Sequence, residues 1–148
     1  MRAKDLIPIL KDLCRTPYKL GSFRKADGLD CLSTTHYFYN SLGFKVPPLN
    51  DFGYGVNSEN YKELYEKNRE EALDLMFKII RDWTEQVDVK RLKVCDLLLV
   101  RKGSDKFVAV YIGSGNLLVV HVRGGVFILT RRLLKTDWME ARRFAKQE

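Results

Sequence analysis

The spacing of the apolar residues changes near residue 95, and this change limits the architectures that the chain can form. Apolar residues recur at helical spacing in three earlier segments: 3–14, 31–42 and 58–87, the last of which thins near residue 68. Short β-branched runs follow at 96–100, 107–113, 116–122 and in GGVFILT, 124–130. Helices followed by neighbouring strands predict the α+β class, with helices packed on an antiparallel sheet from about 95 to 130. Ser58 is the expected N-cap of the third helix, and the tail after residue 133 is expected to be helical or extended.

The length and composition suit one globular domain spanning 1–148. Hydrophobic residues make up 45% of the 148 residues and charged residues 30%, which excludes a disordered or collagen-like chain. No apolar run approaches the roughly 20 residues of a membrane span. The first residues lack the apolar core and cleavage site of a signal peptide. We therefore expect a chain that is cytoplasmic as made or virion-associated.

The charge is unevenly distributed along the chain. Its net value is +7, with an excess of basic residues in 1–50 and 101–148 and of acidic residues in 51–100. Such basic ends are compatible with nucleic acid, an acidic wall polymer or an acidic protein face. A nucleic-acid partner is not expected, because Arg131-Arg132 and Arg142-Arg143 have no recognised binding motif around them.

The cysteines point to chemistry at one position only. Cys14, Cys31 and Cys95 show neither a CxxC pair nor metal-ligand spacing, so we expect no disulfide framework, no metal and no cofactor. Cys14 and Cys95 fit apolar core positions. Cys31 ends the segment GLDC, where a loop becomes a helix, and the partial positive charge of a helix N-terminus favours a thiolate. A buried structural cysteine is the alternative at this position.

Five segments of the sequence, taken in order, resemble the NlpC-type papain-fold cysteine peptidases. They are TPYKLGS (16–22), GLDC (28–31), YFYNSLGFKVP (37–47), VCDLLLVR (94–101) and FVAVYIGSGNLLVVHV (107–122). The ending GGVFILTRRL (124–133), followed by a Trp and an Arg-rich tail, is similar to the phage-tail members. The resemblance implies a papain-like α+β fold that carries a helical insertion at about 55–92.

The resemblance also implies roles for individual residues in the hydrolysis of peptidoglycan peptides. Cys31 matches the nucleophile, and Tyr18 matches a tyrosine that assists the oxyanion together with the backbone N–H of Cys31. His121 matches the residue that orients the general base. The base itself is missing, because Phe107 stands at its position.

The surroundings of the nucleophile also depart from the family pattern. The Ser-Gly that follows the nucleophile in the family is Leu32-Ser33 here, and Cys95 and Ser22 stand where the family has glycine. Asp30, Ser33 and Phe107 are the candidate substrate-binding residues around Cys31.

These matches predict an NlpC-like cell-wall peptidase homologue that is degenerate or weakly active, in effect a pseudoenzyme. Loss of a general base typically costs ~10²–10⁴ in rate. A working dyad of Cys31 and His121 stays open as the active alternative. His36 lies five residues after Cys31, about 140° round the same helix, so we expect it to face elsewhere.

A non-enzymatic structural or adaptor protein, such as a phage-tail component, is the second reading. It would bind a wall peptide or a protein partner through the cleft that holds the nucleophile in the family, or through the basic surface. The acidic segment 55–92 could contact a basic protein face or fold over the cleft. The aromatic residues in and just before this segment, Phe52, Tyr54, Tyr61 and Tyr65, are expected to serve packing.

Overall fold

A computed structural model describes residues 1–22, 25–121 and 123–145 of the chain. The α-helices are α1 (Ile7–Leu13), α2 (Cys31–Ser41), α3 (Ser58–Lys67) and α4 (Arg69–Trp83). Short 3₁₀ helices occur at η1 (Ala3–Leu6), η2 (Lys25–Asp27) and η3 (Arg131–Leu133). The strands are β1 (Thr84–Val87), β2 (Leu97–Lys102), β3 (Asp105–Gly113), β4 (Asn116–His121), β5 (Gly125–Thr130) and β6 (Trp138–Phe144).

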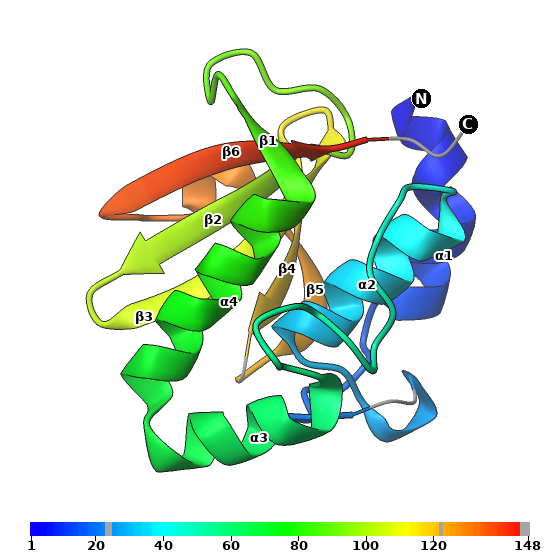
Figure 1. Cartoon of the computed structure of the whole chain (residues 1–148). Helices are drawn as coiled ribbons and strands as arrows, with labels where there is room; N and C mark the ends of the chain where they lie inside the picture. Colours follow the sequence, from blue (N-terminus) through cyan, green and yellow to red (C-terminus); the bar gives the residue numbers. More distant parts are fainter. Residues whose placement is uncertain (23–24, 122, 146–148) are drawn as a thin grey trace.

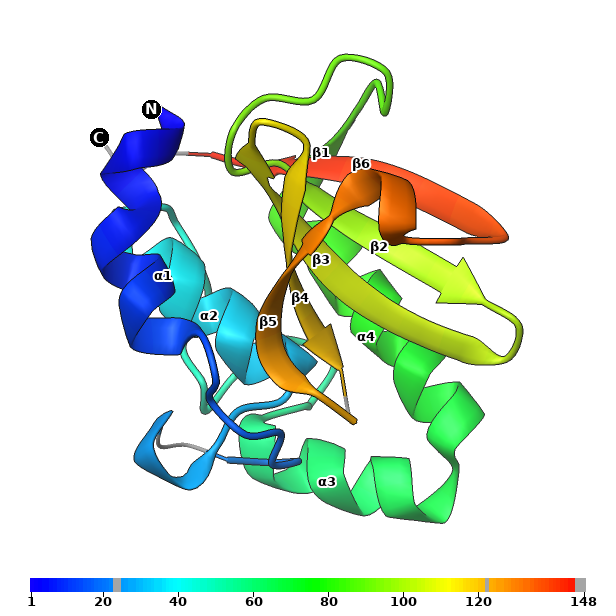
Figure 2. The same cartoon turned by 180° about the vertical axis from the view of Figure 1, so that it is seen from behind.

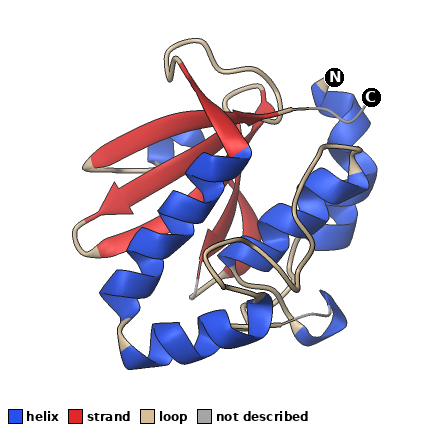
Figure 3. Ribbon diagram, in the orientation of Figure 1, coloured by secondary structure: helices blue, strands red, loops and turns tan. Residues whose placement is uncertain are grey.

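The six strands form one antiparallel sheet in the order β1-β6-β2-β3-β4-β5. Helices α2 and α4 lie on the same side of this sheet, in front of it in Figure 1 and behind it in Figure 2. Figure 3, coloured by secondary structure, shows these helices (blue) on one side of the strands (red). The predicted α+β class, with helices packed on an antiparallel sheet, is confirmed.

Local sequence explains both ends of α2, the helix that begins at Cys31. Asp30 is its N-cap, and the carboxylate accepts hydrogen bonds from the backbone N–H (2.8 Å) and hydroxyl (2.9 Å) of Ser33. The hydroxyl of Ser33 in turn accepts from the backbone N–H of Asp30 at 2.9 Å, which completes a capping box. Gly43 follows the helix with a φ of +82°, a conformation that glycine adopts without strain.

The long helical prediction from Ser58 to Val87 is correct in its first part and wrong in its last. The chain breaks at Asn68, where the apolar stripe thins, and Asn57 rather than Ser58 is the N-cap of α3. Residues 84–87 form strand β1 instead of helix, paired with β6.

The end of α4 is bonded to a residue about 60 positions further along the chain. The guanidinium of Arg142 on β6 donates to the carbonyl oxygens of Arg81 (3.0 Å) and Thr84 (2.8 Å) and to the Thr84 hydroxyl (2.9 Å). Helical periodicity carries no information about such a distant partner. Thr84 also caps the helix locally, because its backbone N–H donates to the carbonyl oxygen of Arg81 and its hydroxyl to that of Ile80.

The C-terminal tail, predicted as helical or extended, contains strand β6. This strand lies between β1 and β2, so the sheet extends beyond the expected 95–130. Arg143 on β6 forms two hydrogen bonds to the carboxylate of Asp96, at 2.7 and 2.8 Å. The Asp96 side chain is only 1% exposed, so this ion pair fixes β6 beside the start of β2.

The core lies between the sheet and its helices and contains side chains from every α-helix. Within the described part of the chain, no helix has the length and apolar character needed to cross a membrane. That the segment 55–92 is an insertion in a single NlpC-like domain stays a prediction.

Candidate functional site

Cys31 is the first residue of α2, as predicted, and its thiol faces the sheet. The side chain is buried, with 7% of the residue exposed. Its Sγ lies 3.7 Å from the carbonyl oxygen of Val120 on β4, to which it donates a hydrogen bond. The thiol proton therefore points to a backbone carbonyl.

The surroundings of Cys31 keep it protonated at neutral pH. Burial raises the pKa of the Cys31 thiol to about 12, and the nearby carboxylate of Asp30 acts in the same direction. A hydrogen bond from the backbone N–H of Val108 opposes this rise, and Asp105 adds to it. The helix N-terminus alone does not produce the low pKa that a catalytic cysteine needs.

Phe107 and His121 lie opposite each other on β3 and β4, next to the thiol. The register pairs Val108 with Val120, which places Phe107 across from His121. Their rings meet edge to face, with centroids 5.6 Å apart and planes at 89°. Both residues line the same small cavity as Cys31. The hairpin predicted from the sequence thus brings all three residues to one place.

The two ring nitrogens of His121 have partners other than the thiol. Nε2 lies 2.8 Å from an oxygen of Asp105, and Nδ1 accepts from the backbone N–H of Arg123 at 3.2 Å. An acceptor role for Nδ1 implies that the proton sits on Nε2 and is donated to Asp105. In this arrangement neither nitrogen is available as a base for Cys31, so the geometry does not support a Cys31–His121 dyad.

Tyr18 also lines this cavity. A parallel bridge between Tyr18 and Leu29 holds it beside the start of α2. Burial, followed by the proximity of Cys31 and Asp30, raises the pKa of the Tyr18 hydroxyl well above its usual value. The hydroxyl is therefore a neutral donor, which is the form that an oxyanion contact requires. Its catalytic role stays a prediction.

Asp30 and Ser33 lie in the buried interior, outside the cavity at Cys31. Both are buried, at 1% and 0% exposure, and neither lines the cavity at Cys31. The second carboxylate oxygen of Asp30 accepts from the backbone N–H of Gly21 at 2.8 Å, which ties the TPYKLGS loop to α2. The structure gives both residues positions that stabilise the helix start, and their predicted substrate contacts stay untested.

The corner between α3 and α4 covers the thiol. Tyr65, Arg69 and Leu73 complete the cavity wall opposite β3 and β4, leaving a space of about 20 Å³. That space holds about one water molecule, because a single water needs roughly 10–15 Å³. A peptide substrate does not fit in it. The sequence had left open whether segment 55–92 folds over the cleft, and in this structure it does.

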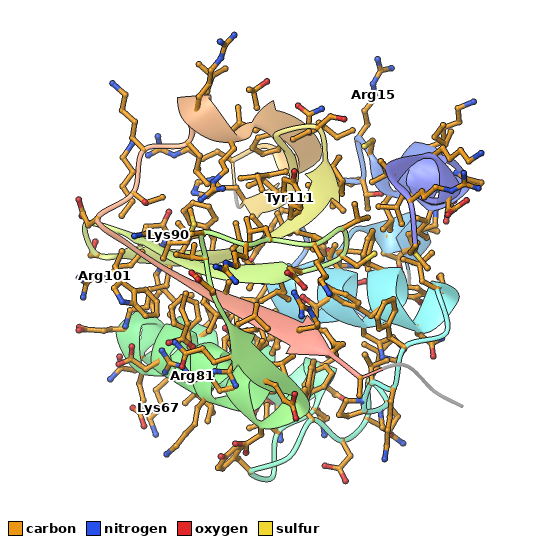
Figure 4. The ribbon with its side chains drawn as sticks, turned by 90° about the horizontal axis from the view of Figure 1, so that it is seen from above. Arg15, Lys67, Arg81, Lys90, Arg101 and Tyr111 are labelled. Atoms are coloured by element: carbon orange, nitrogen blue, oxygen red, sulfur yellow. The ribbon has the colours of Figure 1, made fainter. Side chains whose placement is uncertain are left out.

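Ion pairs hold this cover on the sheet. Arg69 lies 3.3 Å from Asp105, the same carboxylate that contacts His121, and its guanidinium also lies over the ring of Tyr65 at 5.7 Å. Lys106 pairs with Asp74 of α4. A further pair, between Arg81 (labelled in Figure 4) and Glu140 at 2.9 Å, joins the end of α4 to β6.

Sequence reasoning missed Asp105 and Arg69 as members of the site. The signal for Asp105 was available, because it lies two residues before Phe107 and strand alternation puts both on one face. No comparable signal existed for Arg69, whose contact depends on how α4 crosses the sheet. His36, as expected, faces elsewhere, with Nδ1 2.8 Å from the carbonyl oxygen of Pro47. Among the described residues, no group of three or more His, Cys, Asp or Glu side chains could hold a metal ion.

Comparison with known proteins supports the fold. No model of a known family matches the sequence. No curated protein matches it either. Among solved structures, an NlpC/P60 family protein from Bacillus cereus is similar, with 23% identity and a TM-score of 0.59 over 97% of this chain. The match covers 40% of that protein, so the chain spans less than half of its length.

Two further structures match over most of both chains. The NlpC/p60 domain of the peptidoglycan hydrolase SagA is 17% identical, with a TM-score of 0.58 over 97% of this chain and 99% of that domain. RipD from Mycobacterium tuberculosis, a non-catalytic NlpC/p60 domain protein adapted to peptidoglycan binding, is 14% identical, with a TM-score of 0.54 over 97% and 98%. The resemblance seen in the sequence is thus confirmed in three dimensions: the chain has the fold of the NlpC/P60 domains.

Proposed function

We propose that this chain is a non-catalytic NlpC/P60-fold protein that recognises peptidoglycan stem peptides. The observation that carries the proposal is the state of Cys31, which is buried beneath the α3–α4 corner and has a carbonyl oxygen as its hydrogen-bond partner. A protein of this fold without a reactive thiol retains the surfaces around the old cleft. RipD, described as non-catalytic and peptidoglycan-binding, is a precedent for an NlpC/p60 domain that binds peptidoglycan without catalysis.

The chemistry of the site argues against efficient hydrolysis. Attack on a peptide carbonyl needs a thiolate and a base within hydrogen-bond reach. Phe107 cannot accept a proton, and His121 is occupied by Asp105 and Arg123. The pKa of about 12 at Cys31 leaves almost no thiolate at neutral pH.

A groove beside the closed cavity offers a place for a wall peptide. It has a volume of about 440 Å³ and lies between the loop after Tyr18 and helix α3. Lys19 and Lys62 supply positive charge there, and Asp27 and Glu59 supply negative charge. Stem peptides carry both carboxylates and an amine, so a groove with both signs of charge complements them.

Two charge reversals on the same helix test this binding mode. Lys62→Glu changes the groove, whereas Lys67→Glu makes the same change of charge at the last residue of α3 (Figure 4), which is not among the residues that line the groove. We expect the first to weaken the binding of a purified stem peptide at least about fivefold and the second to change it less than twofold, as measured by calorimetry. Equal effects of the two variants, or no binding by the unmodified chain, would refute recognition in this groove.

A structural or adaptor role, for example in a phage tail, is the second candidate. The small size of the cavity at Cys31 favours this role, since a space of about 20 Å³ leaves no room for a peptide ligand. In that case a protein partner would contact the outer surface of the α3–α4 corner. The absence of stem-peptide binding, together with a stable complex formed through this corner, would favour the adaptor. Its location in a virion stays a prediction.

A further inference from the structure

A second cavity lies at the opposite end of α2 from Cys31. Its volume is about 480 Å³, within the range of small-molecule sites. Phe44, which follows α2, and Phe144 at the end of β6 form part of its wall, together with Met1 and Val94. Figure 1 shows the start of the chain close to the end of β6. The 11 residues of α2 separate it from the thiol by about 16 Å.

We infer that this cavity binds a small amphipathic carboxylate, with an aromatic or short acyl body against the apolar wall and the carboxylate beside Lys93 and Arg143. The inference does not depend on the proposed function, because the cavity shares no lining residue with the site at Cys31. It also differs from the polar groove beside α3 in having mainly apolar side chains.

The charged side of the cavity is prearranged by Asp96. Its buried carboxylate accepts two hydrogen bonds from the Arg143 guanidinium and one, at 2.8 Å, from the backbone N–H of Lys93. These bonds fix the guanidinium plane and hold the Lys93 backbone at the cavity edge. A cation that is already oriented loses little conformational entropy when it binds a ligand.

The charges that line the cavity favour an anion. Asp96 neutralises the guanidinium of Arg143, and the ammonium of Lys93 has no ion-pair partner among the residues that the structure describes. The described lining therefore carries more positive than negative charge, and a carboxylate complements it.

The shape of the wall selects the body of the ligand. Phe44 and Phe144 are mostly buried, at 6% and 3% exposure, so the small parts of the rings that line the cavity are held in place by the fold. A planar ring or a short chain can cover this surface and displace weakly bound water. The inferred ligand class is thus an aryl or short-chain carboxylate.

Binding of 2-naphthoate, compared with its uncharged amide, tests the inference. We expect saturable one-to-one binding of naphthoate, with amide NMR shifts centred on Val94, Cys95 and Phe144, and binding of 2-naphthamide at least about fivefold weaker. Equal binding of the two probes would refute the charge argument. Shifts centred on the Cys31 cavity or the α3 groove, or no saturable shift at all, would refute the location.

Two variants of the same loop provide the matched control. Lys93→Glu reverses the charge at the cavity, and Lys90→Glu makes the same change three residues earlier, outside its lining. Naphthoate affinity should fall at least about fivefold in the first and less than twofold in the second. Equal losses would show that only the overall charge matters. Val94→Phe adds a ring to the cavity wall and should also weaken naphthoate binding. Unchanged affinity in this variant would show that the naphthoate ring does not bind in the cavity.

Discussion

At Cys31, burial and hydrogen bonding outweigh the electrostatic benefit of a helix N-terminus. The thiol lies under two helices, donates to Val120 and has the charge of Asp30 beside it. Position at the first residue of a helix lowers a cysteine pKa when the thiol is also near a cation or partly exposed. Here the neighbouring ring is Phe107, which supplies neither charge nor a proton acceptor.

Replacing Phe107 with histidine should lower the pKa of the Cys31 thiol. In Phe107→His, an imidazole next to Cys31 would stabilise the thiolate, so the midpoint of Cys31 alkylation with pH should fall clearly below about 12. Mass spectrometry of the alkylated protein provides the measurement. Tyr111→His, further along the same strand, should leave the midpoint unchanged. An unchanged midpoint in Phe107→His would show that position 107 does not face the thiol.

The pKa of Cys31 also predicts how stability varies with pH. Its folded value of about 12 is higher than the ordinary 9.0, so the folded state binds the thiol proton more tightly than the unfolded state. The resulting stabilisation is complete below pH 9 and is lost as the pH rises from 9 towards 12. Urea unfolding across this range should show a smaller loss in Cys31→Ala than in the unmodified chain. Parallel curves for the two proteins would contradict the assigned pKa.

The cap at Asp30 should be the strongest single stabiliser of α2. In Asp30→Ala, the backbone N–H groups of Ser33 and Gly21 lose their acceptor inside the protein, so we expect a loss of about 2 kcal/mol in the free energy of unfolding. Asp27→Ala, in the exposed turn before it, is the control and should change stability by less than about 0.5 kcal/mol. Equal effects would show that Asp30 does not cap the helix.

At the scale of elements, the structure depends on contacts between segments far apart in the chain. The start of α2 and the strands β2–β5 were predictable, because capping residues and β-branched runs are local signals. The end of α4 is bonded to Arg142 on β6, and the cover over Cys31 depends on Arg69 and Leu73 meeting β3. Local periodicity cannot reveal such contacts, which explains why β1 was predicted as helix and the closed cleft was only one of two readings.

The α3–α4 corner should control access to Cys31. Arg69→Ala removes the ion pair with Asp105, which is exposed enough that stability should fall by no more than about 1 kcal/mol. Alkylation of Cys31 in the folded protein should nevertheless become faster, because the corner opens more often. Lys67→Ala, two residues away, should not change the rate. Equal rates in all three proteins would mean that the corner does not limit access.

Strand β5 should be sensitive to a single methyl group. Gly125 has a φ of +67°, and a Cβ there would lie 2.2 Å from the carbonyl oxygen of Thr16, which β5 uses for pairing at Val126. Gly125→Ala should therefore destabilise the protein by about 2 kcal/mol or more, measured by thermal or urea unfolding. Gly103→Ala has a similar φ of +60° but no atom near the added Cβ, so its cost should stay at about 1 kcal/mol. Similar losses in the two variants would contradict the close approach of β5 to the loop.

At the scale of the whole molecule, the NlpC/P60 fold is combined with a closed cavity at Cys31. The order of motifs along the sequence predicted the fold, and the same order placed Phe107 where a base would act. Strand alternation puts Asp105 on the same face as Phe107, but only the structure shows that Asp105 and Arg123 occupy both nitrogens of His121, because the Arg123 contact depends on the turn that follows β4. The proposed binding function therefore rests on the closed cavity at Cys31 and not on the fold alone.

Incubation of the purified chain with stem peptides from peptidoglycan, followed by mass spectrometry of the products, tests the central claim most directly. The unmodified protein should release no more product than Cys31→Ala, since its thiol is protonated, covered and without a base. Cleavage by the unmodified chain that is abolished by both Cys31→Ala and His121→Ala would contradict the account and establish a working dyad.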